Sequence, residues 1–155
     1  MSGLQHLTDE QIIGEAVRLV GEGLAVKLLV KGRSMLPFIK GGLDSVVLTA
    51  PGEILPGDVV LARIDGKRYV LHRVMEVADG RVELMGDGNL AGREVCRPED
   101  VLARADEVVG PDGRHRRLDS PKMKRRARRW RRLLPVRRWL LAIYKRTVIR
   151  NVVIQ

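Results

Sequence analysis

Cysteine, histidine and aromatic side chains are scarce in this chain of 155 residues, and each shortage excludes a class of protein. The single cysteine, Cys96, cannot form an intrachain disulfide or supply a cysteine-rich metal site. Only three histidines are present, which disfavours a zinc site, so we expect no metal and no other cofactor. Aromatic residues make up 3% of the chain, but hydrophobic residues make up 45%, which is enough for one domain with a core.

Long uninterrupted apolar segments are also missing. The stretch over residues 12–30 is broken by charged side chains at four positions, so it does not predict a transmembrane helix. The first thirty residues do not have the pattern of a secretory signal. On this basis we expect a cytoplasmic protein, with peripheral association at a membrane left open.

Positive charge is scarce in the first three-quarters of the chain and dense in the rest. Residues 1–113 hold 13 Lys and Arg against 18 Asp and Glu, whereas residues 114–155 hold 16 against Asp119 alone. We therefore predict an acidic body over residues 1–113 and a basic tail over residues 114–155.

The body is predicted to be mostly β, with one helix near the N-terminus. Thr8 and Gln11 have the spacing of a capping box, and apolar residues recur behind them at helical spacing as far as Gly21. After the helix, short apolar runs alternate with turns rich in Gly, Pro and Asp. The runs predict strands over residues 24–30, 45–50, 58–64, 68–77, 81–86 and 101–109, and a glycine-rich loop over residues 87–96.

The tail is predicted to form two basic amphipathic helices, with a break near Pro135. Trp130 and Trp139 lie on their apolar stripes, between arginines. Three hypotheses fit this pattern: an anchor at an anionic membrane surface, packing against the body or a second copy, and nucleic-acid binding. The first two rank close together, and nucleic acid ranks third because the apolar stripe is wide and the body is acidic.

One serine lies in an unusually constrained segment. Ser34 stands in "KGRSMLPFIKGG", where glycines flank a Met-Leu-Pro that cannot continue a helix. A serine becomes a nucleophile when a base takes its proton and a third group orients that base. In the body His72 offers a base at neutral pH, and Asp87, in a turn after a strand, is a candidate to orient it.

These residues resemble a known family. "GRSMLPFI", "LPGDVVLAR", "YVLHRVMEV" and "ELMGDGN" are similar, in this order, to the conserved boxes of the type I signal peptidase superfamily, which includes the LexA-like self-cleaving repressor domains. The resemblance covers about Leu29 to Val108. It implies a signal-peptidase/LexA-like β core and cleavage of a peptide or protein substrate.

The resemblance also implies roles for individual residues. Ser34 falls on the nucleophile, and His72 falls where bacterial members carry a lysine base, as in the archaeal and endoplasmic-reticulum branch. Asp87 falls on an aspartate that supports the base or the local fold. Gly32 replaces a residue that supplies a hydroxyl to the oxyanion hole in some members, so the amide of Ser34 would carry more of that role. Substrate contacts are assigned to Gly32, Met35 and Leu36.

Each of these residues also has a purely structural interpretation. Taken singly, Ser34 is a turn serine, His72 a half-exposed strand residue and Asp87 part of a turn. Lys67 is a rival base, but its place beside a hairpin turn favours a solvated charge. The chain shows neither the N-terminal anchor of membrane signal peptidases nor a helix-turn-helix, which favours a cytoplasmic maturation protease for a leader peptide. The alternative is a non-catalytic family member that binds peptides or a membrane surface.

Overall fold

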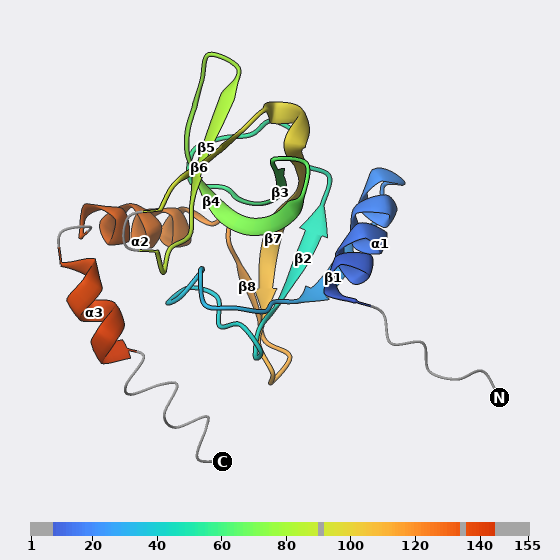
Figure 1. Ribbon diagram of the computed structural model, residues 1–155. Helices are drawn as coiled ribbons and strands as arrows, with labels where there is room; N and C mark the ends of the chain where they lie inside the picture. The colour runs from blue at the N-terminus through green and yellow to red at the C-terminus, as the bar shows by residue number, and fades with distance from the viewer. Residues whose placement is uncertain (1–7, 90–91, 134–135, 145–155) are drawn as a thin grey trace.

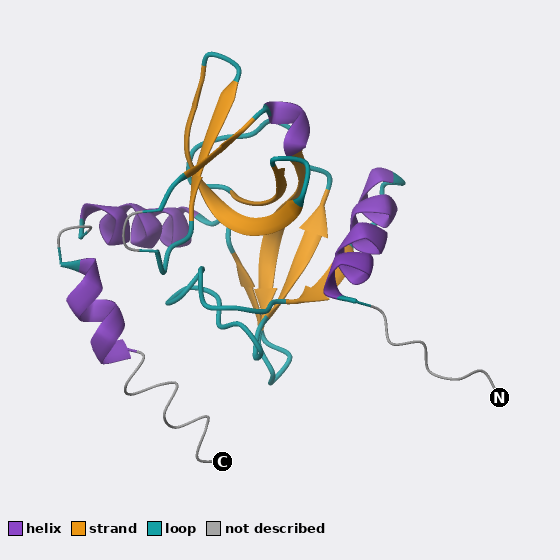
Figure 2. Cartoon of the chain, viewed as in Figure 1, coloured by secondary structure: helices purple, strands orange, loops and turns teal. Residues whose placement is uncertain are grey.

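A single strongly curled antiparallel sheet dominates the fold, and helices lie on either side of it (Figures 1 and 2). The computed structural model describes residues 8–89, 92–133 and 136–144. The strand order is β1-β2-β7-β3-β4-β5-β6, and β8 pairs with β7. The elements are α1 (Asp9–Gly21), β1 (Val26–Leu29), β2 (Ser45–Thr49), β3 (Val59–Ile64), β4 (Arg68–Ala78), β5 (Arg81–Met85), β6 (Glu94–Cys96), the 3-10 helix η1 (Pro98–Asp100), β7 (Val101–Val109), β8 (His115–Arg117), α2 (Pro121–Arg132) and α3 (Arg137–Tyr144).

The mostly-β fold class and the N-terminal helix are confirmed. Helix α1 begins with the predicted capping box: the backbone N–H of Gln11 donates to Thr8 Oγ1 over 3.2 Å, and that of Thr8 donates to Gln11 Oε1 over 2.8 Å. The hairpin turn between β3 and β4 places Asp65 and Gly66 at positive φ, as its Asp-Gly sequence predicts.

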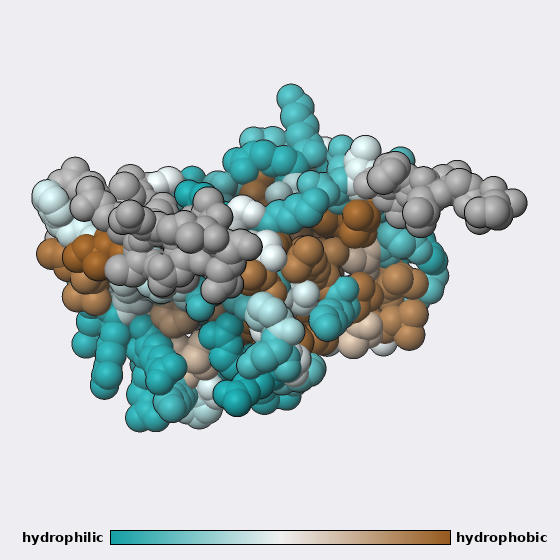
Figure 3. All heavy atoms as spheres, turned by 90° about the horizontal axis from the view of Figure 1, so that it is seen from below, coloured by the Kyte–Doolittle hydropathy of each residue, from teal (hydrophilic) through white to brown (hydrophobic). Residues whose placement is uncertain are grey.

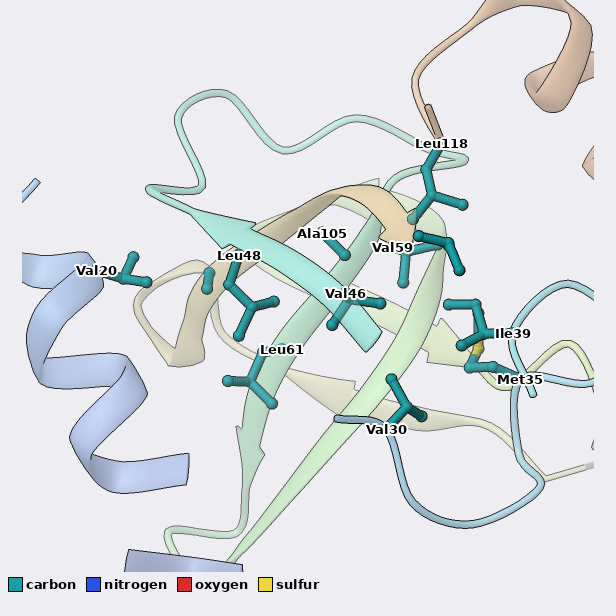
Figure 4. Close-up of a cluster of buried hydrophobic side chains, with 12 residues drawn as sticks. Val20, Val30, Met35, Ile39, Val46, Leu48, Val59, Leu61, Ala105 and Leu118 are labelled. Atoms are coloured by element: carbon teal, nitrogen blue, oxygen red, sulfur yellow. The ribbon is translucent and has the colours of Figure 1, made fainter. Parts of the chain in front are cut away.

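Strand β4 separates two apolar clusters because its side chains alternate between the faces of the sheet. Tyr69 and Leu71 pack against a first cluster, while Val70 and Val74 belong to a second. The first cluster is the main core and joins side chains from several elements, as Figure 4 shows. Its fully or nearly fully buried members include Val20, Met35, Ile39, Val46, Leu48, Val59, Leu61, Ala105 and Leu118.

Two short strands depart from the predicted pattern. Strand β6 occupies the end of the segment that was predicted to be loop, and it pairs with β5. Strand β8 lies beyond residue 113 and pairs with β7, so the sheet continues into the region assigned to the tail. All three residues of β8 are exposed and basic in character, and a strand without a buried face gives no apolar alternation to recognise.

The tail contains two helices, as predicted, on either side of a break between Arg132 and Arg137; Pro135 itself lies outside the described residues. Helix α2 packs on the body: Ala127 is 1% exposed, and Met123 packs against the main core. Helix α2 therefore behaves as one of the three hypotheses for the tail proposed, namely packing against the body. On α3, Trp139 is 64% exposed and Ile143 61%, and binding to a membrane surface stays a prediction for this helix. In the described parts of the chain, no helix is both long and apolar enough to cross a membrane.

The packing of α2 leads to a test on two neighbouring positions. We expect Ala127→Gln to lower the free energy of unfolding by about 1–3 kcal/mol, because a long polar side chain replaces a methyl group in a closed contact. Arg126→Gln introduces the same side chain on the exposed face of the same helix and should change stability by less than about 0.5 kcal/mol. Urea unfolding of both variants measures the difference. Equal midpoints would show that α2 does not contribute to the stability of the body.

Candidate active site

Ser34 lies in a closed loop between β1 and β2. The loop is clamped at its base, where the N–H of Gly42 donates to the carbonyl of Val30 over 2.7 Å. Gly32 has a φ of +84°, and a Cβ at Gly41 would lie 1.8 Å from the Gly32 carbonyl oxygen, so the turn requires glycine at both positions. Residues 32–36, here called the serine corner, are thus held in place mainly by backbone geometry and less by side-chain contacts.

The two residues after Ser34 anchor this corner in the protein. Met35 is 2% exposed and Leu36 3%, and Met35 points into the main core together with Ile39 (Figure 4). Their contacts in this structure are with the protein interior, so the assignment of substrate contacts to Met35 and Leu36 stays a prediction. Ser34 itself is half-buried at the surface of the corner.

The serine corner rests on the turn that follows β5. The N–H of Gly88 donates to the Ser34 carbonyl over 2.7 Å, and a Cβ at Gly86 would lie 2.3 Å from the same oxygen. Met85 pairs with Arg73 in the ladder between β4 and β5, so Gly86, the next residue, comes opposite His72 at the end of the strand. The fold therefore brings the Ser34 backbone to the end of β5 where His72 lies. No direct hydrogen bond joins the two side chains within the described residues.

His72 is buried in the middle of β4, with only 5% of its surface exposed. Its side chain is on the same face of the strand as Val70 and Val74, as the alternation predicted. Burial lowers the pKa of His72, while the Glu94 carboxylate acts in the opposite direction. The ring is thus held neutral near pH 7, the state in which an imidazole accepts a proton.

The carboxylate beside the His72 ring is Glu94, on β6. Nδ1 of His72 lies 3.7 Å from Glu94 Oε1. Sequence reasoning missed this residue because it assigned residues 87–96 to a loop. The available signal was the apolar pair Val95 and Cys96 directly after Glu94, which marks the start of a short strand.

Asp87 binds Arg73, the neighbour of His72 on β4. Two parallel hydrogen bonds of 2.8 Å join the guanidinium to the carboxylate, and Arg73 and Asp87 are only 2% and 3% exposed. Arg73 also donates to the carbonyl of Gly57 over 2.8 Å and lies 5.3 Å from the centre of the Phe38 ring. Of the two roles that the resemblance implies for Asp87, these contacts serve the local fold.

Helix α2 reaches the same turn. The indole Nε1 of Trp130 donates to the backbone carbonyl of Asp87 over 2.6 Å. Burial, and the nearby charge of Arg73, lower the pKa of Arg131 on the same helix. The C-terminal end of α2 therefore lies against the turn that carries Asp87, a contact that the tail sequence alone did not indicate.

Two other reactive side chains do not enter the site. Lys67 is exposed at the hairpin turn between β3 and β4. Cys96 is buried, and burial together with nearby carboxylates raises the pKa of its thiol to about 11. It is therefore protonated at neutral pH and is a poor nucleophile.

An apolar pocket of about 500 Å³ lies beside the serine corner. Residues from α1, β1 and β4 line it, including Ile12, Leu28, Leu29, Tyr69 and Leu71. Val30 and Lys31 also line the pocket, and three residues span at most about 10 Å, so the pocket lies within that distance of Ser34. Seen from below, apolar surface gathers toward the α1 and β1 side of the molecule, apart from a second apolar area at the α3 end (Figure 3).

A family model described as Peptidase S24-like matches residues 4–104, which is most of the body and includes Ser34, His72 and Asp87. A search of curated proteins found no match.

The buried ion pair of Asp87 can be compared with an exposed one of the same geometry. We expect Asp87→Asn to lower the free energy of unfolding by about 3–5 kcal/mol, because it leaves the Arg73 charge buried without a counter-ion. Asp119 receives two similar bonds of 2.9 Å from Arg117, but that pair is exposed, so Asp119→Asn should have a far smaller effect. Chemical unfolding measures both variants. A loss of activity in folded Asp87→Asn at unchanged stability would instead assign Asp87 to the reaction.

The contact between Ser34 and Gly86 predicts the effect of adding one methyl group. In Gly86→Ala the new Cβ would overlap the Ser34 carbonyl oxygen, so the serine corner must move away from the turn after β5. We expect a lower melting temperature and a loss of any activity that needs Ser34 beside His72. Gly21→Ala is the control, since no described atom lies within 4 Å of a Cβ there. Similar melting temperatures for the two variants would contradict this packing.

Proposed function

The chain belongs to the Peptidase S24-like family, and we propose that it is a serine endopeptidase with Ser34 as nucleophile and His72 as general base. The main support is the contact of the Ser34 backbone with Gly86, at the position opposite His72. The corner, which requires glycines, holds the Ser34 backbone at this place, and a buried, neutral imidazole lies on β4, the strand next to β5. These are the two groups that nucleophilic acyl transfer requires.

The proposed reaction has two steps. Ser34 Oγ attacks the carbonyl carbon of the peptide bond while His72 takes the hydroxyl proton, and His72 then gives that proton to the leaving amine as the C–N bond breaks. A water molecule next attacks the acyl-enzyme, His72 takes its proton, and Ser34 recovers it as the new carboxyl product leaves. The backbone N–H of Ser34 is the candidate donor to the oxyanion, since Gly32 has no hydroxyl.

An extended peptide is the substrate that fits the surroundings of Ser34. Strand β1 ends the strand order of the sheet and leads directly into the serine corner. A substrate strand that pairs with β1 would place alternate side chains in the apolar pocket beside Leu29 and Tyr69. The pocket therefore favours apolar side chains close to the bond that is cleaved.

The alternative is a family member that binds peptides without cleaving them. Its support is that Ser34 and His72 share no direct hydrogen bond, although such bonds are often long before substrate binds. The two functions differ in one respect: the alternative predicts binding of extended apolar peptides by the full chain with no product.

The test is cleavage of a peptide library, analysed by mass spectrometry. We expect cleavage by the unaltered chain, and a loss of at least ~10³-fold in kcat/KM for both Ser34→Ala and His72→Asn. Because burial lowers the pKa of His72, the rate should rise with pH through a midpoint below about 6.5 and level off near neutrality.

Matched controls separate chemistry from folding. Ser45→Ala removes a hydroxyl from β2, and His115→Asn removes an exposed histidine that contacts Glu107. Both should keep normal cleavage. Equal binding of peptides by the unaltered chain and by Ser34→Ala, with no product from either, would favour the binding module and reject the peptidase.

A further inference from the structure

We infer that Glu94 is the carboxylate that positions His72, so that the site is a Ser34–His72–Glu94 arrangement in which Asp87 has a structural role. This inference rests on the proposed function, because it names the partner of the proposed base. It concerns a positioning residue: Glu94 acts through His72 and does not touch the substrate.

The first observation is the geometry of the pair. Nδ1 of His72 and Oε1 of Glu94 are 3.7 Å apart, which is longer than a hydrogen bond but within a small side-chain rotation of one. Leu84 pairs with Glu94 on one side and with Val74 on the other, so Glu94 and His72 approach across a continuous part of the sheet. The Nη1 of Arg68 donates to Glu94 Oε1 over 3.2 Å and helps to hold the carboxylate in place.

The second observation is that each of the two groups has one buried polar atom without a hydrogen bond. Among the described residues, His72 Nδ1 and Glu94 Oε2 are the buried side-chain atoms without a partner. Leaving such an atom unsatisfied costs about 1–3 kcal/mol, so two of them side by side need an explanation. A rotation of the Glu94 side chain that lets a protonated Nδ1 donate to Oε2 would satisfy both atoms, and Oε1 would keep its bond from Arg68. Nε2 would then be free to accept the proton of Ser34.

Asp87 is poorly placed for the same duty. Both of its carboxylate oxygens already accept hydrogen bonds of 2.8 Å from Arg73, and a buried arginine that lost them would be left without a counter-ion. The side chain of Glu94 is 17% exposed and has one oxygen without a partner. The carboxylate with spare hydrogen-bonding capacity is therefore the one beside the ring.

The charges around His72 show what Glu94 contributes when the ring takes a proton. Burial lowers the pKa of His72; Glu94 on β6 and Asp87 in the turn after β5 raise it, and Arg68 on β4 lowers it. The largest of the three charge effects is that of Glu94. Glu94 thus stabilises the imidazolium that would form in a site with little water.

Glu94→Gln tests the inference because it keeps the shape and removes the charge. We expect kcat/KM to fall by about 10²–10⁴-fold, since the amide neither fixes the tautomer of the ring nor stabilises its charge. Removing the carboxylate also removes an influence that raises the pKa of His72, so the acid limb of the pH profile should move to lower pH. KM should change much less than kcat, and Glu94→Asp should recover part of the rate.

Glu83→Gln is the matched control on the same hairpin. Glu83 lies on β5 and its carboxylate binds Arg93 over 2.7 Å, at a partly exposed position away from His72. It should leave kcat/KM and the pH profile unchanged. A Glu94→Gln variant that also kept both, while Ser34→Ala and His72→Asn lost activity, would overturn the role of Glu94 and leave the peptidase intact.

A second measurement does not depend on activity. Nitrogen-15 NMR of the full chain carrying Ser34→Ala reports which nitrogen of His72 bears the proton and the pH at which the ring titrates. We expect the proton on Nδ1, and a shift of the tautomer or a lower titration midpoint when Glu94→Gln is added. If neither changes, the inference fails. If both change but no peptide is cleaved by the unaltered chain, the contact stands and the proposed function fails.

Discussion

The buried ion pair between Arg73 and Asp87 is the interaction on which the site depends. A guanidinium that is 2% exposed is stable only when its charge and its hydrogen bonds are satisfied, and four separate segments contribute to this. Asp87 supplies the counter-ion, Gly57 a carbonyl and Phe38 an aromatic face, while Trp130 holds the backbone of Asp87. The loop between β1 and β2 that carries Ser34, the turn after β5 and helix α2 therefore all contact this one ion pair.

The alternation of side chains along β4 places the buried ion pair of Arg73 and the candidate base His72 on opposite faces of the strand. Arg73 and His72 are neighbours in the chain, so their side chains leave the strand on opposite faces. On one face Arg73 donates to both carboxylate oxygens of Asp87. On the other face, His72 lies among apolar residues beside Glu94. Each basic residue thus has a carboxylate of its own. The close approach of Ser34 to the turn after β5 depends on the glycines of that turn, because a Cβ at Gly86 would push the loop away.

Some of the positive charges of the tail form ion pairs with acidic residues of the body. Arg116, beyond the predicted boundary at residue 113, lies 3.3 Å from Asp44, a carboxylate that is 3% exposed. Lys124 on α2 lies 4.0 Å from Asp58. These contacts connect the tail to the base of the serine loop and to the turn before β3. At least two basic residues of the tail therefore pair with acidic residues of the body.

The sequence by itself determined the features that depend on local rules. Capping at Thr8, Asp-Gly turns and period-two alternation are encoded within a few residues, and they were sufficient to place α1, six of the strands and His72 on its face. The tertiary structure decided which carboxylate lies beside Arg73 and which lies beside His72. The sequence pointed to Asp87, which lies in a turn after a strand, and not to Glu94, which lies in a segment that was predicted to be a loop. Only the register of β4, β5 and β6 places Asp87 against Arg73 and Glu94 beside His72. The docking of Trp130 likewise depends on a contact between residues far apart in the chain, which no local pattern specifies.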